Sequence, residues 1–567
     1  MSGQRWVERL AIPLGFALTV AVLAVVFFYP VGSVFVEAIW RTGAPTLGPI
    51  VGVLTDPFYI DLFRFTAYQA LLSTVASVLL GLPGAYLLAR YEFPGRQTLR
   101  SLTILPFVLP AIMVAVGFVA MFGTSGFLND LLGAVGLGPI HLMYTLQIIL
   151  LAHAFYNAPL VTRLVATAWE SVDVRRVETA RAMGASRARA FRDVILPQLL
   201  PALLTAALLT FIFTFMSFPI VLALGGLQLA TVEVWIYARV QALDLADAAT
   251  LATLETALSL LLLYVYLRFE ARQTADNSGG PSLPRRALLD GWQTLTDFPR
   301  MALLGYCLVG LVVFVGPLVS LVIESVTGPN GHLTLAYYQF LLSRQTATAA
   351  GTTKPLPAVV NSLVYGVGTL LIAVPMGVVV AVVATRDLPG SRLAEAILTA
   401  PLAVSGVVVG IGLLQTFVFG TVLFGYRFTV VGPLAIVLAH SVAAYPFVTR
   451  NVAPALGSID HRLVDAAQSL GATRARVLLD VELPLIGAAL TAGAAFAFAI
   501  SIGEFDSTVL LASNTGSYTM PVALQRYIGN RSVGPSLGPA TAMGTVLLVI
   551  TAASFLVIDR LGGRWDL

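Results

Sequence analysis

One stretch of this sequence occurs twice, 287 residues apart, and each copy interrupts a series of long apolar runs. The first copy reads VETARAMGASRARAFRDVILP, from Val177 to Pro197, and the second reads VDAAQSLGATRARVLLDVELP, from Val464 to Pro484. Charged segments between long apolar runs face water in a membrane protein. A water-facing segment that occurs twice indicates a docking surface for two copies of one partner.

The composition supports a membrane protein and argues against a nucleic-acid-binding one. Apolar residues make up 57% of the 567 residues and charged residues only 11%, as is typical of membrane proteins. The apolar runs are long enough to cross a hydrocarbon core of about 30 Å. The net charge is only +4, and the basic residues are scattered between the runs, as anchoring charges are.

The apolar runs predict an all-α polytopic membrane protein made of two tandem halves, each with six membrane-spanning helices. In the first half we expect spans at Ala11–Val36, Phe65–Ala89, Leu102–Phe122, Tyr144–Val161, Leu199–Leu224 and Ala248–Leu267. In the second half we expect them at Met301–Ile323, Val359–Ala384, Ile397–Phe417, Val430–Val448, Leu485–Ile502 and Ala540–Val557.

A polar segment between the halves predicts a linker. The sequence TADNSGGPSLPRR is rich in Gly, Pro and Ser and carries basic residues, a composition typical of linkers. We therefore expect a first transmembrane half at residues 1–270, a cytoplasmic linker at 271–300 and a second half at 301–567.

The first apolar run resembles a signal peptide but is longer than the apolar region of most signal peptides. Its end, YPVGSVFVEAI, is repeated at the same spacing as GPLVSLVIESV, with Pro30 over Pro317 and Glu37 over Glu324. A segment repeated within the second half is expected to stay in the protein, so we interpret this run as a retained first span.

The distribution of basic residues predicts the orientation. An even number of spans puts both termini on one side, and 25 of the 33 Lys and Arg residues then lie on that side. The positive-inside rule places this side in the cytoplasm. Both charged repeats are therefore expected to be cytoplasmic. The halves are expected to be parallel and related by an axis along the membrane normal, with a translocation path between them.

The first part of the charged segment has a helical pattern. Between Arg175 and Ala182, Glu178 is expected to face water, whereas Val177, Ala180 and Met183 are expected to face inward. This pattern predicts a short helix lying on the membrane surface.

The second part of the segment predicts a turn and another short helix. Gly184 permits a sharp turn, and the helix from Arg187 to Ile195 presents Arg187 and Arg189 to water. Pro197 suits the first turn of the following span. The second copy repeats the main positions: Asp465, Ala467, Gly471, Arg474, Arg476 and Pro484.

The spacing of the repeated segment resembles the EAA motif of ABC importer permeases. The motif begins with an acidic residue, which is followed two positions later by Ala and four positions after that by Gly. Nine residues then separate this Gly from the sequence V-x-L-P. These are Glu178, Ala180 and Gly184 in the first copy, with Asp465 replacing Glu in the second. The resemblance implies that each segment is a coupling helix that docks into an ABC ATPase subunit.

The resemblance also implies the partners: two cytoplasmic ATPase subunits and an external substrate-binding protein. The only lysine is Lys354, which is followed by Pro355, so a GxxxxGK[ST] loop is absent from the sequence. ATP is therefore expected to bind to another subunit. We expect no cofactor, no nucleic acid and no bond chemistry in this chain.

Two coupling motifs in one chain resemble the fused permeases of the thiamine and iron(III) importers. SFPIVLALGG with TVEVWIY, and SIGEFDSTVLLAS with YTMPVALQRYIGNRS, are more similar to the thiamine permeases. Asp506 stands where that pattern usually has Gly. The resemblance implies a thiamine-type cation as substrate, with iron(III) as the alternative.

Four residues near the ends of or within spans are candidates for the pathway. Glu504 and Asp506 follow a span at its outer end and are candidates for attracting a cation, or else for capping the outer rim. Tyr156 and Asn157 interrupt the fourth span and suggest either stacking on a substrate ring or hydrogen bonding between helices.

Other polar residues favour structural roles. His153 and His440 occupy equivalent positions, as do Arg163 and Arg450 at the inner ends of the fourth spans, where Arg side chains reach toward the membrane surface. The histidines and Cys307 form no cluster with metal-ligand spacing. Two alternatives remain, an ion-driven secondary transporter, which does not explain paired coupling motifs, and a membrane-embedded enzyme, for which no catalytic group is evident.

Overall fold

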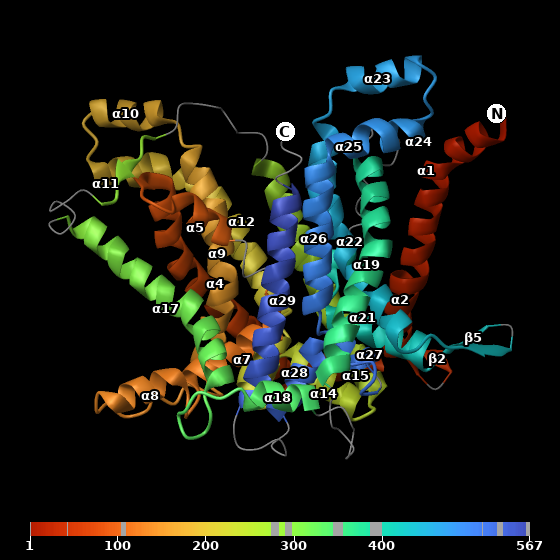
Figure 1. The fold of residues 1–567 in the computed structure, drawn as a ribbon, viewed down its shortest axis with the longest axis horizontal. Coiled ribbons are helices and arrows are strands. Elements are labelled where there is room, and N and C mark those ends of the chain that lie inside the picture. The colour runs from red at the N-terminus through yellow and green to blue at the C-terminus, as the bar shows by residue number, and fades with distance from the viewer. Residues whose placement is uncertain are drawn as a thin grey trace.

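The computed structural model describes residues 2–41, 43–103, 109–273, 283–289, 297–343, 355–385, 398, 400–423, 425–512, 514–529 and 537–562. Helices dominate, and Figure 1 shows most of the long ones running side by side from one end of the molecule to the other. The strands described form three short two-stranded pairs: β1 (Trp40–Arg41) with β2 (Ala44–Pro45), β3 (Tyr91–Glu92) with β4 (Arg286–Ala287), and β5 (Thr421–Leu423) with β6 (Tyr426–Phe428).

The first half supplies six long helical segments and several short helices. The long segments are α1–η1–α2 (Ser2–Leu23, Ala24–Phe28, Tyr29–Ile39), α4 (Pro57–Arg90), α7 (Ala111–Phe122), α9 (Leu146–Glu170), α11–η2–α12 (Arg187–Ala190, Phe191–Ile195, Leu196–Phe215) and α15 (Leu245–Gln273). The short ones are α3 (Gly48–Thr55), α5 (Arg96–Leu102), α8 (Phe127–Ala134), α10 (Val174–Ala182), α13 (Pro219–Gly225) and α14 (Val232–Gln241).

The second half repeats this order. Its spanning segments are α17 (Phe298–Val326), α19 (Pro355–Ala384), α21–η4 (Gly406–Leu413, Leu414–Val418), α22 (Pro433–Gly457), α26 (Gly487–Gly503) and α29 (Gly538–Gly562). The short helices are α18 (Ala336–Ser343), η3 (Ala400–Ala403), α23 (His461–Ser469), α24 (Arg474–Val477), η5 (Leu478–Glu482), α25 (Leu483–Leu485), α27 (Thr508–Leu511) and α28 (Met520–Gly529).

The expected polytopic helical fold is confirmed. Each of the twelve expected spans contains a helix, and eight helices of the described residues are long and apolar enough to cross a membrane. The shorter apolar helices Gly406–Val418 and Gly538–Ser554 and a pair bent by 84°, Arg474–Leu485 with Gly487–Gly503, occupy three of the remaining spans. Helix α22 occupies the last one. The division at residues 270 and 301 stays a prediction.

The end of the fifth span in the first half was predicted wrongly for an identifiable reason. We expected the fifth span to continue to Leu224, but α12 ends at Phe215 and α13 begins at Pro219. Proline lacks an N–H donor, and its ring clashes with the carbonyl group of the residue four positions earlier, here Phe215. The helix therefore breaks before Pro219, and the apolar residues beyond it belong to a separate short helix.

The first span of each half packs against the other half. In Figure 1, α1 lies beside α19, whereas α17 lies on the side of α4 and α9. The contacts are reciprocal: a Cβ at Gly117 of α7 would lie 2.7 Å from the Pro317 carbonyl oxygen, and one at Gly412 of α21 would lie 2.6 Å from that of Pro30. Because Pro30 and Pro317 are repeat equivalents, the halves are related by a pseudo-two-fold axis.

A cluster of charges ties the described part of the linker to the first half. Glu170, at the end of α9, accepts hydrogen bonds from Arg96 at 2.6 Å and from Arg285 at 3.1 Å. Arg96 is buried and also donates to the backbone of Leu88. Strand β4, in the linker, pairs in parallel with β3. The linker is thus held against the end of α4, next to the helix that leads into the first charged segment.

Candidate functional site

The two charged segments fold as predicted, into a helix, a glycine turn and a second helix. Gly184 and Gly471 have φ angles of +88° and +86°, a left-handed conformation that side chains disfavour. Asp173 caps the first helix by accepting from the Arg175 N–H at 2.9 Å, and Asp460 does the same for α23. Both hairpins lie at the same end of the molecule (Figure 1).

An apolar side chain stands at the tip of each hairpin. We expected Met183 to face inward, which is wrong: it is 83% exposed, and its repeat equivalent Leu470 is 90% exposed. The helix ends one residue before Met183, and the following glycine reverses the chain, so the side chain points outward instead of continuing the helical face. Exposed apolar side chains at matched positions indicate a contact surface for a partner.

The other predicted coupling residues lie in the helices on either side of these tips. No residue of α10 or α23 is buried, which leaves Glu178 and Asp465 accessible. The caps Ser186 and Thr473 accept from the backbone of Arg189 and Arg476, so these arginines lie in the first turn of the second helix. Pro197 and Pro484 stand in the first turn of α12 and α25, as expected.

The two hairpins join their spans differently. In the first half the second helix continues through α12 as one helix from Arg187 to Phe215. In the second half, α24, η5 and α25 lie at 84° to α26, which Figure 1 shows as a nearly horizontal helix above a vertical one. A displacement of either hairpin would therefore act directly on the fifth span of its half.

The equivalent histidines are buried and fully hydrogen-bonded at the opposite end of the spans. His153 contacts the Ser73 hydroxyl through Nδ1 at 2.8 Å and the Ser217 hydroxyl through Nε2 at 2.9 Å. Both rings hold neighbouring elements together, which agrees with the structural role expected for them.

His440 has a charged partner that His153 lacks. Its Nδ1 lies 2.8 Å from Ser501 Oγ, and its Nε2 lies 2.7 Å from Thr508 Oγ1 and 3.1 Å from Glu504 Oε2. Glu504 also accepts from the Ser507 N–H at 2.8 Å and from the Thr508 hydroxyl. Because Ser217 and Glu504 are repeat equivalents, one substitution changes a contact with a hydroxyl group into a contact with a carboxyl group.

The remaining pathway candidates are engaged within the helix bundle. The Tyr156 hydroxyl donates to the Leu109 carbonyl at 3.2 Å, and Asn157 Nδ2 donates to the His153 carbonyl at 2.9 Å. The Tyr156 bond joins α9 to the segment before α7, whereas the Asn157 bond stays within α9. Asp506 is partly exposed and packs on the backbone at Gly406. A Cβ atom added at Gly406 would lie 2.7 Å from the Asp506 Cβ atom.

An aromatic pair, which was not identified from the sequence, lies between the halves. The rings of Phe218 and Phe505 stack with centroids 5.6 Å apart and planes 19° apart, and both side chains are buried. The two residues are 287 positions apart, so they are repeat equivalents. Residues related by a two-fold axis touch each other only next to that axis. The stack therefore lies on the pseudo-axis, where the predicted path would run.

Two buried acids were also missed. Glu233 on α14 and Glu255 on α15 are 0% and 1% exposed, and their carboxyl groups face each other. Each carboxyl group contacts the other, and Ser405 lies beside Glu233. Within the described residues, no basic side chain forms a salt bridge with either acid. Glu255 falls inside the expected span Ala248–Leu267, so the rule that ionisable groups within spans are functional candidates would have identified it.

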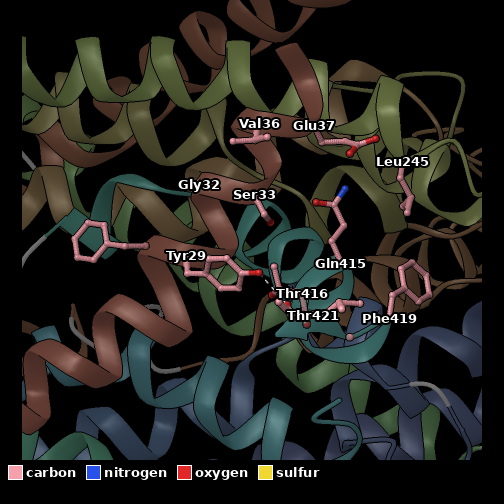
Figure 2. A pocket seen from close by; sticks show the side chains of 13 residues that line it. Tyr29, Gly32, Ser33, Val36, Glu37, Leu245, Gln415, Thr416, Phe419 and Thr421 are labelled. Atoms are coloured by element: carbon pink, nitrogen blue, oxygen red, sulfur yellow. Dashed lines mark hydrogen bonds between the residues drawn. The ribbon is translucent and has the colours of Figure 1, made fainter. Parts of the chain in front are cut away.

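A cavity of about 760 Å³ lies away from these groups, between α2 and the η4–β5 region (Figure 2). Tyr29 bonds to Thr421 across it at 2.9 Å, and Glu37 and Gln415 contribute polar atoms. None of the predicted coupling or pathway residues lines it. Among the described residues, no group of three or more His, Cys, Asp or Glu side chains could hold a metal ion.

The family model described as "Binding-protein-dependent transport system inner membrane component" matches residues 77–273 and 373–566. The chain thus belongs to this family, with one copy in each half, and is a multi-pass membrane permease. The family match also confirms the resemblance to ABC importer permeases that the repeated motif indicated.

Among its relatives is the thiamine transport system permease protein ThiP of Escherichia coli, 29% identical over 91% of each chain. ThiP of Brucella abortus is 28% identical over 89% of this chain and 88% of the relative. The sulfate transport system permease protein CysT of Salmonella typhimurium is 32% identical over 39% of this chain and 79% of its own length. A solved bacterial ABC transporter that imports alginate covers 49% of this chain at 16% identity, with a TM-score of 0.39.

Proposed function

We propose that this protein forms the complete transmembrane pathway of an ABC importer for thiamine or a closely related small cation. The observation that carries the proposal is the pair of hairpins at one end of the molecule, each with a glycine turn and an exposed apolar tip. Two such surfaces fit two ATPase subunits, and the family match supports dependence on an external binding protein.

In the proposed mechanism, the ATPase subunits bind ATP and close on each other, which draws the two hairpins together. The hairpins are joined to the fifth spans, so the motion passes along α12 and α26 to the pseudo-axis. The path then opens to a substrate-loaded binding protein outside. This chain catalyses no bond chemistry, and ATP hydrolysis takes place on the partners. Both termini lie in the cytoplasm.

The choice of thiamine rests on similarity along nearly the whole chain. Relatives that match about nine-tenths of this sequence include thiamine permeases, and the phrases around Phe218 and Phe505 resemble theirs. The proposed roles of Glu504 and Asp506 are consistent with a cationic substrate, because carboxylates near a low-dielectric path offset part of the desolvation of a cation. Iron(III) remains the alternative substrate.

Uptake by cells carrying this permease with its native ATPase and binding protein tests the proposal. We expect labelled thiamine to be taken up and chelated ferric iron not to be. Neutralising both acids, Glu504→Gln with Asp506→Asn, should slow thiamine uptake while the binding protein keeps its affinity. Uptake of iron without thiamine would overturn the choice of substrate and leave the importer assignment standing. Uptake of neither would reject both substrates.

A further inference from the structure

The stacked pair on the pseudo-axis is part of a larger aromatic and acidic cluster that the coupling mechanism does not explain. Phe218 contacts not only Phe505 but also Tyr237 of α14, whose ring centroid lies 5.2 Å away. Tyr237 is buried as well. Three aromatic rings from both halves thus meet where the path is closed.

Three carboxyl groups lie on the elements that carry these rings or pack against them. Glu233 lies one helical turn before Tyr237, so both side chains project from the same face of α14. Asp506 directly follows Phe505, and its charge lies close to Glu233. Glu255 approaches Glu233 from α15, which packs against α14, and both helices contact α21.

The two buried acids of this cluster, Glu233 and Glu255, have no basic partner among the described residues. Glu504 is satisfied by His440 and two hydroxyl groups, whereas Glu233 and Glu255 contact chiefly each other, with Ser405 beside Glu233. No described salt bridge joins Glu233, Glu255 or Asp506 to a basic side chain. Arg526, on the nearby α28, lies over the Tyr518 ring at 5.8 Å instead.

We propose that Phe218, Phe505 and Tyr237, together with Glu233, Glu255 and Asp506, form a binding station for an organic cation, seen here in its closed state. Aromatic faces attract cations, most strongly where water is excluded, and carboxyl groups that have no basic partner gain one when a cation arrives. The identity of the cargo rests on the proposed function, whereas the cation selectivity of the station does not.

The same residues explain how the path is closed and why it selects a cation. With the halves together, the Phe218 and Phe505 rings cover each other and block the pseudo-axis. When the fifth spans separate, the two rings part and expose their faces to the cargo. The carboxyl groups then supply the charge that the cargo lost with its water shell.

The first test measures ATP-driven uptake of labelled thiamine by the complete complex in proteoliposomes. Glu233→Gln and Glu255→Gln keep the side-chain shape and remove the charge. We expect each to lower uptake about tenfold, the effect of one lost interaction with a charged group, while ATP hydrolysis stimulated by the binding protein persists. The matched control is Glu324→Gln, a half-buried acid outside the cluster, which should change uptake by less than about twofold. Uptake at the wild-type rate in both cluster variants would overturn the proposal.

The second test does not depend on the cargo. In a planar bilayer under a choline chloride gradient, the double variant Phe218→Ala, Phe505→Ala should conduct, with a reversal potential that shows preference for choline over chloride. Adding Glu233→Gln and Glu255→Gln should remove that preference. Absence of conductance, or a preference that survives the loss of the acids, would refute the station. If wild type imports no thiamine but the open variant is cation-selective, only the proposed substrate is wrong.

Discussion

The two halves of the internal repeat are similar at one end of the molecule and different at the other. At the hairpin end the halves are nearly alike: Gly184 and Gly471 adopt the same left-handed turn, and Met183 and Leu470 stand exposed at matched tips. At the opposite end, Ser217 in one half is replaced by Glu504 in the other. Identical surfaces suit two copies of the same partner, whereas a single substrate on the axis meets both halves at once and does not require them to be alike.

The largest expected effect comes from the hairpin turns. Replacing both Gly184 and Gly471 with Val should abolish transport, because a β-branched residue strongly disfavours a φ near +88°. The protein should still reach the membrane, since both turns lie outside the helical core. Membrane content and thiamine uptake check this, with Gly→Asn at both positions as the control, because Asn tolerates the left-handed conformation. Normal transport by the Val variant would remove the coupling role.

The exposed tips should contribute to the affinity for the ATPase. Met183→Ala and Leu470→Ala should each weaken binding of the isolated ATPase by about tenfold, as expected for truncation of an apolar anchor that is buried in an interface. The effects should be similar, because the two surfaces are alike. Titration of the permease in nanodiscs measures them, with Thr179→Ala as the control, since that hydroxyl bonds only within its own helix. Unaffected binding would place the contact elsewhere on the hairpins.

The outer ends should respond unequally to matched substitutions. Glu504→Gln removes an anionic acceptor from His440 and from the Ser507 and Thr508 donors, so we expect a loss of about 1–3 kcal/mol of stability. Ser217→Ala removes one neutral contact and should cost about 1 kcal/mol. Thermal unfolding in detergent compares them. Equal losses would mean that the carboxyl contact of His440 adds nothing beyond the hydroxyl contact of His153.

The orientation can be tested with little effect on function. Replacing Cys307 with Ser gives a cysteine-free chain, into which Ser186→Cys, Thr473→Cys and Asp56→Cys are introduced singly. A membrane-impermeant thiol reagent should label positions 186 and 473 only from the cytoplasm and position 56 only from outside, following the distribution of basic residues. Labelling with the opposite sidedness would reverse the assignment of the termini.

Much of this architecture could be predicted because it depends on local signals. The spans follow from runs of apolar residues, and the hairpins follow from charges, a turn glycine and a proline at fixed spacing. The same local reasoning failed at Pro219, where an apolar run continues through a break in the helix, and at Met183, where the helix ends before its face is complete. Hydropathy does not detect a change of chain direction.

The sequence by itself determined that the chain crosses the membrane many times, that it is duplicated and that it presents two matched surfaces to water. It did not reveal the stack of Phe218 on Phe505 or the pairing of Glu233 with Glu255, because each depends on helices brought together from distant parts of the chain. Only the tertiary structure decided which residues meet at the pseudo-axis. An apolar or acidic side chain has the same local signature wherever its helix packs, and its role depends on what lies opposite.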